Sequence, residues 1–272
     1  DLPYMGSTIR VADLNSDGWK DALVAEDVGE HVMVLHNTAG VLTYVGELDA
    51  LYPLDQIELA ETDGMNGPDV VARFFAGPMT EVHVFRNTGS GTFDPLPVVH
   101  SLPDVVRYMD VGDVDQDGLD DLAVIGWNTF GKLYRALGGG VYGAGTDIAP
   151  DGEGVTIRDL DDDGWRDVVV AGPGQATVSM NQSGSGFIDE VWTLPGLGHL
   201  GIPHPFPGDT STRYFLPDLA DDELGLLAWS DCASAHELFL LTGANDVELF
   251  AADVTGDAGV DLLAFRPWDG EV

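Results

Sequence analysis

A short acidic loop recurs along this chain at a nearly constant interval, and this repeat constrains the fold more than any other feature. Four copies align without gaps and two are weaker; the six begin at residues 13, 61, 113, 159, 218 and 253. Their starts are therefore 48, 52, 46, 59 and 35 residues apart. An interval near 48 residues accommodates four short strands with their turns, which indicates a repeat architecture.

Each repeat has the same order of strand-like segments. In the first copy, residues 8–12 lead into the loop, the apolar run 22–25 leaves it, and residues 32–35 form a third strand before a turn at 37–40. The run that leaves the loop lacks alternation, which is typical of a strand buried on both faces. Repeated four-stranded antiparallel sheets predict a β-propeller, whereas solenoid repeats are usually shorter and parallel.

The repeats extend over nearly all of the chain, so we expect one all-β propeller domain over residues 1–272. Six repeats predict six blades. Only residues 266–272 follow the last strand pair, too few for two outer strands, so the sixth sheet is expected to be incomplete. The alternative is a fragment of a seven-bladed propeller. The 35 glycines and 15 prolines interrupt any longer helical pattern, which agrees with an all-β fold.

The acidic loop has the pattern of a calcium site. Oxygen-bearing side chains occupy positions 1, 3, 5 and 9, a glycine at position 6 permits a sharp bend, and the carbonyl at position 7 completes the shell. An EF-hand would need Glu at position 12, where these loops have Val or Ala. The competing interpretation is an ordinary turn, but a turn needs only one or two such residues.

We therefore predict three calcium sites and a fourth that is less regular because Ala258 replaces the glycine at position 6. The residues of the three sites are Asp13, Asn15, Asp17, Trp19 and Asp21; Asp113, Asp115, Asp117, Leu119 and Asp121; and Asp159, Asp161, Asp163, Trp165 and Asp167. Those of the fourth are Asp253, Thr255, Asp257 and Asp261. Loops 61–69 and 218–226 are predicted to be metal-free, since Met65 takes position 5 in the first, and Ala220 and Leu226 take positions 3 and 9 in the second.

The loop motif, Asp-x-[Asp/Asn]-x-Asp-Gly-x-x-Asp followed by an apolar strand, resembles the FG-GAP/VCBS repeat of integrin α-subunit propellers and of many secreted bacterial proteins. The resemblance extends over nearly the whole chain, although only three copies carry the full motif. It implies a propeller whose loops join the first and second strands of each blade and hold calcium structurally. It implies no particular partner, because propellers host unrelated activities.

Charge excludes several functional classes. The chain has 47 Asp+Glu against 11 Lys+Arg, for a formal charge of -36. Binding to nucleic acid or to an anionic membrane surface needs clustered basic residues, so neither is expected. No apolar run is long enough to insert into a membrane. With 44% hydrophobic residues the chain can nevertheless build a core.

No catalytic constellation stands out in the sequence. Cys232 and His236 could be drawn as a nucleophile and base, but a lone cysteine is more often a buried apolar residue. His199 and His204 flank a Pro-rich insertion at 198–208 and are expected to be loop residues.

A binding face is expected where the chain emerges from the second strand of each blade, opposite the acidic loops. Aromatic rings beside polar groups suit sugars and protein partners, although such rings also pack between blades. The candidate ligand-binding residues are Trp127, Asn128, Trp229, Asp231, Arg266 and Trp268. We expect a calcium-binding module, secreted or at the cell surface, for a glycan or an extracellular protein. The alternatives are a propeller enzyme acting on polysaccharide and a structural module of a larger adhesin.

Overall fold

A computed structural model describes residues 6–26, 31–49, 54–76, 79–103, 105–126, 130–149, 152, 154–161, 163–172 and 175–193, together with strand segments at 204–205, 213–218, 223–228, 237–242, 248–252 and 261–265. The chain divides into two compact units, residues 1–150 and 151–272. Among the described residues, no helix is long and apolar enough to span a membrane.

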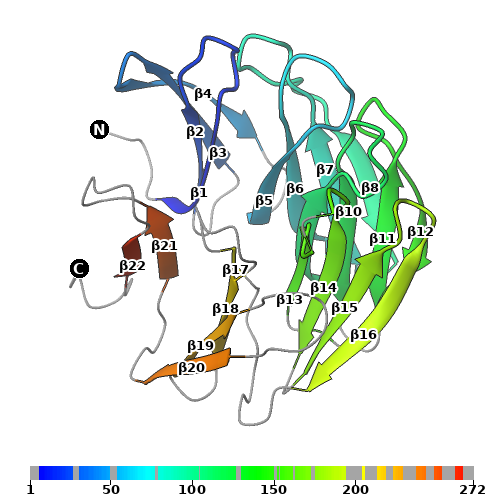
Figure 1. Cartoon of the computed structure of the whole chain (residues 1–272). Helices are drawn as coiled ribbons and strands as arrows, with labels where there is room; N and C mark the ends of the chain where they lie inside the picture. The colour runs from blue at the N-terminus through cyan, green and yellow to red at the C-terminus, as the bar shows by residue number, and fades with distance from the viewer. Residues whose placement is uncertain are drawn as a thin grey trace. The chain divides into compact units, whose positions relative to one another are not determined.

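The first unit holds three sheets, each formed by four strands that pair antiparallel with their neighbours in chain order (Figure 1). The first sheet consists of β1 (Gly6–Ala12), β2 (Asp21–Glu26), β3 (His31–Thr38) and β4 (Val41–Asp49). The second consists of β5 (Leu54–Ala60), β6 (Asp69–Ala76), β7 (Met79–Phe85) and β8 (Val98–Leu102). The third consists of β9 (Val106–Gly112), β10 (Asp121–Gly126), β11 (Gly131–Ala136) and β12 (Tyr142–Asp147).

The second unit continues the pattern and then departs from it. Its first sheet repeats the four-stranded meander, while the next begins with a strand of two residues and the last has two strands among the described residues. The strands are β13 (Gly154–Arg158), β14 (Asp167–Gly172), β15 (Gln175–Asn181) and β16 (Phe187–Thr193); β17 (His204–Pro205), β18 (Arg213–Asp218), β19 (Glu223–Ala228) and β20 (Glu237–Thr242); and β21 (Glu248–Ala252) and β22 (Asp261–Phe265).

The predicted burial pattern is confirmed in the sheets whose side chains are described. Every residue of β10 and of β14 is buried, whereas most residues of the outer strand β4 are exposed. The continuous apolar runs thus lie between packed layers, and the more polar fourth strands face solvent. In the first unit, one apolar cluster joins the first and second sheets around Phe74, and another joins the second and third around Met109.

Polar side chains tie the first strands of the three sheets in the first unit. Arg10 on β1 pairs with Glu58 on β5 through two contacts of 2.8 and 2.6 Å. Gln56 on β5 exchanges two hydrogen bonds with the backbone of Met109 on β9, at 2.7 and 3.2 Å. These strands therefore lie side by side, which places the loops that follow them at one end of the sheets.

Two local expectations need correction. The turn predicted at 37–40 is the two-residue turn Ala39–Gly40, because Asn37 and Thr38 still pair with β4. Positive φ angles of 53° and 88° at these two residues match the hairpin turn that follows the strand twist. His204, expected in a loop, lies with Pro205 in the short edge strand β17, a type of strand in which proline is tolerated.

Candidate metal centres

The acidic loops of the first four repeats join the first and second strands of their sheets, as predicted, whereas the fifth repeat falls at the connection of the second and third strands of its sheet. Three of the loops share one internal geometry. In each, the backbone N–H of the glycine at position 6 donates to the Oδ2 of the Asp at position 1, at 2.9 Å in Asp13, Asp113 and Asp159. These glycines have φ angles of 87–89°, a left-handed conformation that strains other residues. The glycine is therefore what turns the loop back over its first carboxylate.

A second hydrogen bond fixes the Asp at position 5. Its Oδ1 accepts from the N–H of residue 7 at 2.8 Å in all three loops, through Asp17, Asp117 and Asp163. The backbone at position 7 belongs to Trp19, Leu119 and Trp165, whose carbonyls are the expected ligands. Local hydrogen bonds thus hold the loop shape that the spacing predicts.

The Asp at position 9 is buried and bridges two strands. Its Oδ2 accepts from the N–H of loop position 2, and its Oδ1 accepts from an N–H at the end of the third strand of the same sheet, at distances between 2.7 and 3.2 Å. The four residues are Asp21, Asp69, Asp121 and Asp167, each no more than 1% exposed. Position 9 is therefore a structural bridge as well as a candidate ligand, a role that the sequence analysis missed.

Burial makes the carboxylates of Asp167 and Asp121 costly to ionise. Desolvation raises the pKa of Asp167 to about 6, partly offset by the N–H donors of Asn181 and Leu160, and the nearby Asp161 and Asp159 raise it further. Desolvation likewise raises the pKa of Asp121. A bound cation would reverse this effect, because an opposite charge within reach favours the ionised form.

Carboxylates converge in two of the predicted sites. One ligand atom from each of Asp113, Asp115 and Asp121 lies within 4.8 Å of the others, and the same holds for Asp159, Asp161 and Asp167. Oδ1 of Asp115 is buried and has no hydrogen-bond partner. Since buried polar atoms are normally satisfied, these oxygens fit a hard cation. In the first loop the side chain at position 3 is the amide of Asn15, where the other two loops have the carboxylates of Asp115 and Asp161.

Loop 61–69, one of the two loops predicted to be metal-free, has its own acidic cluster. Glu61, Asp63 and Asp69 each offer an oxygen within 4.8 Å of the others, but Met65 is 55% exposed and contributes no oxygen at position 5. Desolvation raises the pKa of Asp69 to about 6. The bridge of Asp69 to Thr62 and Asn87 accounts for an aspartate at position 9 without a metal.

Several predicted site residues lie outside the described part of the chain. These are the fourth-loop residues Asp253, Thr255 and Asp257, and all six candidate ligand-binding residues, Trp127, Asn128, Trp229, Asp231, Arg266 and Trp268. Asp261 is the first residue of β22. Cys232 also lies outside the described residues.

An asparagine that the sequence analysis treated only as a turn residue completes three of the bridges. Its N–H donates to the Asp at position 9, its Oδ1 caps the following turn, and its Nδ2 donates to the carbonyl just before that Asp, in Asn37, Asn87 and Asn181. The signal was its recurrence 16, 18 and 14 residues after the Asp. In the third sheet Ala136 takes this place, with only its backbone N–H.

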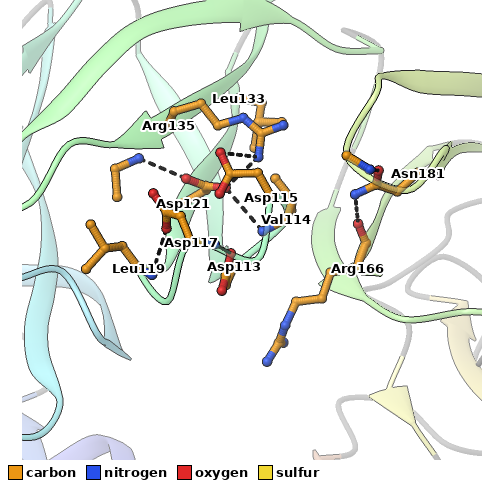
Figure 2. A network of polar contacts seen from close by, with 12 residues as sticks. Asp113, Val114, Asp115, Asp117, Leu119, Asp121, Leu133, Arg135, Arg166 and Asn181 are labelled. Carbon is orange, nitrogen blue, oxygen red and sulfur yellow. Dashed lines mark hydrogen bonds and ion pairs between the residues drawn. The ribbon is translucent and has the colours of Figure 1, made fainter. Parts of the chain in front are cut away.

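The third sheet also brings a basic residue to its loop. Nη1 of Arg135 lies 2.7 Å from Oδ2 of Asp121 and 3.7 Å from Oδ2 of Asp115 (Figure 2). The sequence analysis did not connect Arg135 with the loop, because the two are separated by most of β10 and β11.

Comparisons with known proteins agree with this description. Residues 63–124 match the model of the FG-GAP-like repeat. Integrin alpha-3 of Cricetulus griseus is 27% identical over 147 residues, and that of Mus musculus 26%. The alignment covers 48% of this chain but only 13% of either integrin.

Solved structures resemble the chain in fold. An Agrocybe aegerita lectin that recognises non-reducing terminal N-acetylglucosamine has a TM-score of 0.60 at 20% identity, covering 86% of this chain and 65% of the lectin. A chain of the BBS1N–ARL6DN complex has a TM-score of 0.61 at 14% identity, covering 94% of this chain and 75% of that one. These likenesses confirm the all-β, propeller-type fold, while the number of blades stays a prediction. The family match over residues 63–124, the integrin relatives and the recurring loops together support an FG-GAP-type repeat in this chain.

Proposed function

We propose that loops 13–21, 113–121 and 159–167 bind calcium, and that the protein is a calcium-stabilised extracellular module that binds a glycan or a protein. The observation that carries the calcium assignment is the convergence of oxygen side chains in a loop shape that recurs three times with the same hydrogen bonds. Loop 253–261 is proposed as a fourth site on its sequence pattern alone.

The chemistry of the donors favours calcium. All the candidate ligands are carboxylate, amide, hydroxyl or backbone oxygens, which hard cations prefer, and no histidine or cysteine lies in the loops. A flexible set of six to eight oxygens suits calcium better than magnesium, which demands a near-ideal octahedron and keeps more water. Calcium would offset the repulsion among the clustered carboxylates and fix the first and second strands at the loop end of each sheet.

The role as a binding module rests on the fold and on the relatives. The lectin and the integrin sequences support a module that binds sugars or proteins, and calcium sites of the millimolar class suit an extracellular setting. On the sequence pattern alone, the proposed ligand-binding residues are Trp127, Asn128, Trp229, Asp231, Arg266 and Trp268. The competing functions are an enzyme acting on polysaccharide and a structural segment of a larger adhesin.

Thermal and chemical unfolding with calcium and with chelator test the metal assignment. For a dissociation constant of ~10⁻⁴ to 10⁻³ M, 10 mM calcium stabilises the folded state by about 1.4 to 2.7 kcal/mol per site. Magnesium at equal concentration should stabilise less. An unchanged midpoint with calcium and with chelator would contradict the assignment.

Two variants at loop position 3 sharpen the test. Asp161→Asn lies in a proposed site and should lose part of the calcium-dependent stabilisation. Asp63→Asn lies in the loop predicted to be metal-free and should keep all of it. Equal losses in the two variants would contradict the distinction between the loops.

A glycan array followed by product analysis tests the binding role. Binding of sugars without turnover supports a lectin-like module. Release of products from a polysaccharide would instead favour the enzyme.

A further inference from the structure

We propose that the positive charge of Arg135 competes with calcium for the carboxylates of loop 113–121. This loop therefore binds calcium with lower affinity than loops 13–21 and 159–167. The inference rests on the proposed calcium function and adds a ranking of the sites. It means that the three loops, although alike in sequence, do not fill together as calcium rises.

The contacts of Arg135 place its charge among the candidate ligands. Nη1 donates to Oδ2 of Asp121 at 2.7 Å and lies 3.7 Å from Oδ2 of Asp115, so one guanidinium faces the carboxylates of positions 9 and 3 (Figure 2). Charge-assisted hydrogen bonds of this kind are about twice as strong as neutral ones. A calcium ion in the loop would have to share or displace this contact.

The hydrogen bonds accepted by the Asp at position 9 support the same ranking of calcium affinities. Oδ2 of Asp121 accepts from both Val114 N–H and Arg135, so both of its lone pairs are used. The corresponding Oδ2 of Asp21 accepts from Leu14 N–H, and that of Asp167 from Leu160 N–H. No arginine adds a hydrogen bond to either of those two carboxylates in the described contacts, which leaves a lone pair on each for a metal.

The residue at the register of Arg135 differs among the first four sheets. The residue just before the third-strand N–H that bonds position 9 is Arg135 in the third sheet, and His36, Arg86 and Met180 in the others. Arg86 donates instead to Asp94, at 2.7 Å.

The third sheet is also the one in which the bridging asparagine is replaced, by Ala136. Arg135 therefore supplies a side-chain contact to Asp121 where the asparagine of the other sheets would support the bridge. The Arg135 side chain is 31% exposed, so it can move toward solvent when a metal displaces it. Oδ1 of Asp115 remains without a hydrogen-bond partner, so the loop keeps an oxygen for calcium once the arginine is removed.

The experiment compares calcium binding by the wild type, Arg135→Met and Arg86→Met, using isothermal titration calorimetry on the whole chain. Methionine is the residue that the fourth sheet has at this register, so the fold accommodates it there. Arg86→Met is the matched control because it removes an equal charge at the same register without touching a loop carboxylate. Arg135→Gln is a second variant that retains a donor and removes only the charge.

Terbium luminescence identifies which loops fill. Tryptophan sensitises bound terbium, and position 7 is Trp19 and Trp165 in two loops but Leu119 in the third. Wild-type emission therefore reports the first and third of the predicted sites. Leu119→Trp, made with and without Arg135→Met, adds a reporter to loop 113–121.

We expect the wild type to show one weaker site, and Arg135→Met and Arg135→Gln to tighten that site by about 5- to 150-fold, the usual range of a coupling free energy between two sites. Arg86→Met should leave the isotherm unchanged. If the wild type binds calcium and neither Arg135 variant tightens any site, the inference is wrong while the proposed function stands. If no variant binds calcium, both are wrong.

Discussion

Replacing Asn87 by Ala should destabilise the protein far more than the same change at Asn37, although both asparagines have the same place in their sheets. Asn87 is 2% exposed, and its Nδ2 donates to the carbonyl of Leu14 at 2.8 Å and to that of Pro68 at 3.2 Å. Its Oδ1 accepts from Gly89 N–H at 2.9 Å. The bond to Leu14 joins the second sheet to the acidic loop of the first.

The magnitude follows from what each lost bond leaves behind. The buried carbonyl of Leu14 would be left unsatisfied, which costs about 1 to 3 kcal/mol, while the partly buried groups at Pro68 and Gly89 can regain water and lose about 0.5 to 1.5 kcal/mol each. Asn87→Ala should therefore cost about 2 to 6 kcal/mol. Asn37 makes its two side-chain bonds, to Lys20 and Gly40, at exposed positions, so Asn37→Ala should cost about 1 kcal/mol.

Urea unfolding in chelator measures both variants without a contribution from metal. Because the loss is in the folded state, the midpoint should fall while the slope with denaturant stays the same. If Asn87→Ala and Asn37→Ala differ by less than about 0.5 kcal/mol, the buried bond to Leu14 does not contribute as argued.

Two further substitutions test polar contacts of the first unit. Thr62 Oγ1 donates a hydrogen bond to Asp69, and burial raises the pKa of Asp69 from 3.8 to about 6. Ionisation of Asp69 therefore lowers the stability of the folded state as the pH rises through 6. The hydrogen bond from Thr62 stabilises the ionised carboxylate and so limits this loss of stability. Thr62→Val should cost about 1.5 to 3 kcal/mol at pH 8 and clearly less at pH 5, and a pH-independent loss in denaturation curves would disprove this linkage. Glu58→Gln should cost about 1 to 3 kcal/mol, between the values for surface and buried pairs, because it leaves Arg10 without its carboxylate. The more exposed pair of Arg86 and Asp94 provides the control, since Asp94→Asn should cost under about 1 kcal/mol, and equal effects would refute the role of burial.

The strands and the loop geometry could be predicted because they depend on residues close in sequence. The bend at Gly18 and the hydrogen bond from Trp19 to Asp17 lie within one loop, so spacing alone fixes them. The continuous apolar run of β10 likewise indicates from its own residues that the strand is buried.

Contacts between distant residues could not be predicted in the same way. The bond from Asn87 to Leu14 spans 73 residues, and the choice of Arg135 over Arg86 as the arginine that meets a loop depends on which neighbour each side chain reaches. Periodicity gives the register of a strand but not the direction of a long side chain.

The fifth repeat shows where a regular period misleads. The segment predicted as loop 218–226 begins at the last residue of β18 and ends inside β19, so its predicted bounds are wrong. Because β17 pairs with β18 on the other side, this connection joins the second and third strands of its sheet. Among the residues that the structure describes there, one strand, β20, lies between β19 and β21, which agrees with the short interval of 35 residues to the next loop. The repeat was recognised from its loop, and the loop does not determine which edge strand completes the sheet.

The use of the few basic residues bears on the choice among the proposed functions. In the first unit, Arg10, Arg86, Lys132 and Arg135 each pair with a carboxylate, and Arg73 donates to the carbonyl of Val106. These cations are engaged within the fold, while the chain carries a formal charge of -36 that three Ca²⁺ would reduce only to -30. An enzyme that acts on acidic polysaccharides must hold its substrate against that field with free basic groups. A neutral glycan or a basic protein surface meets no such barrier, so the charge favours these ligands over an acidic polysaccharide.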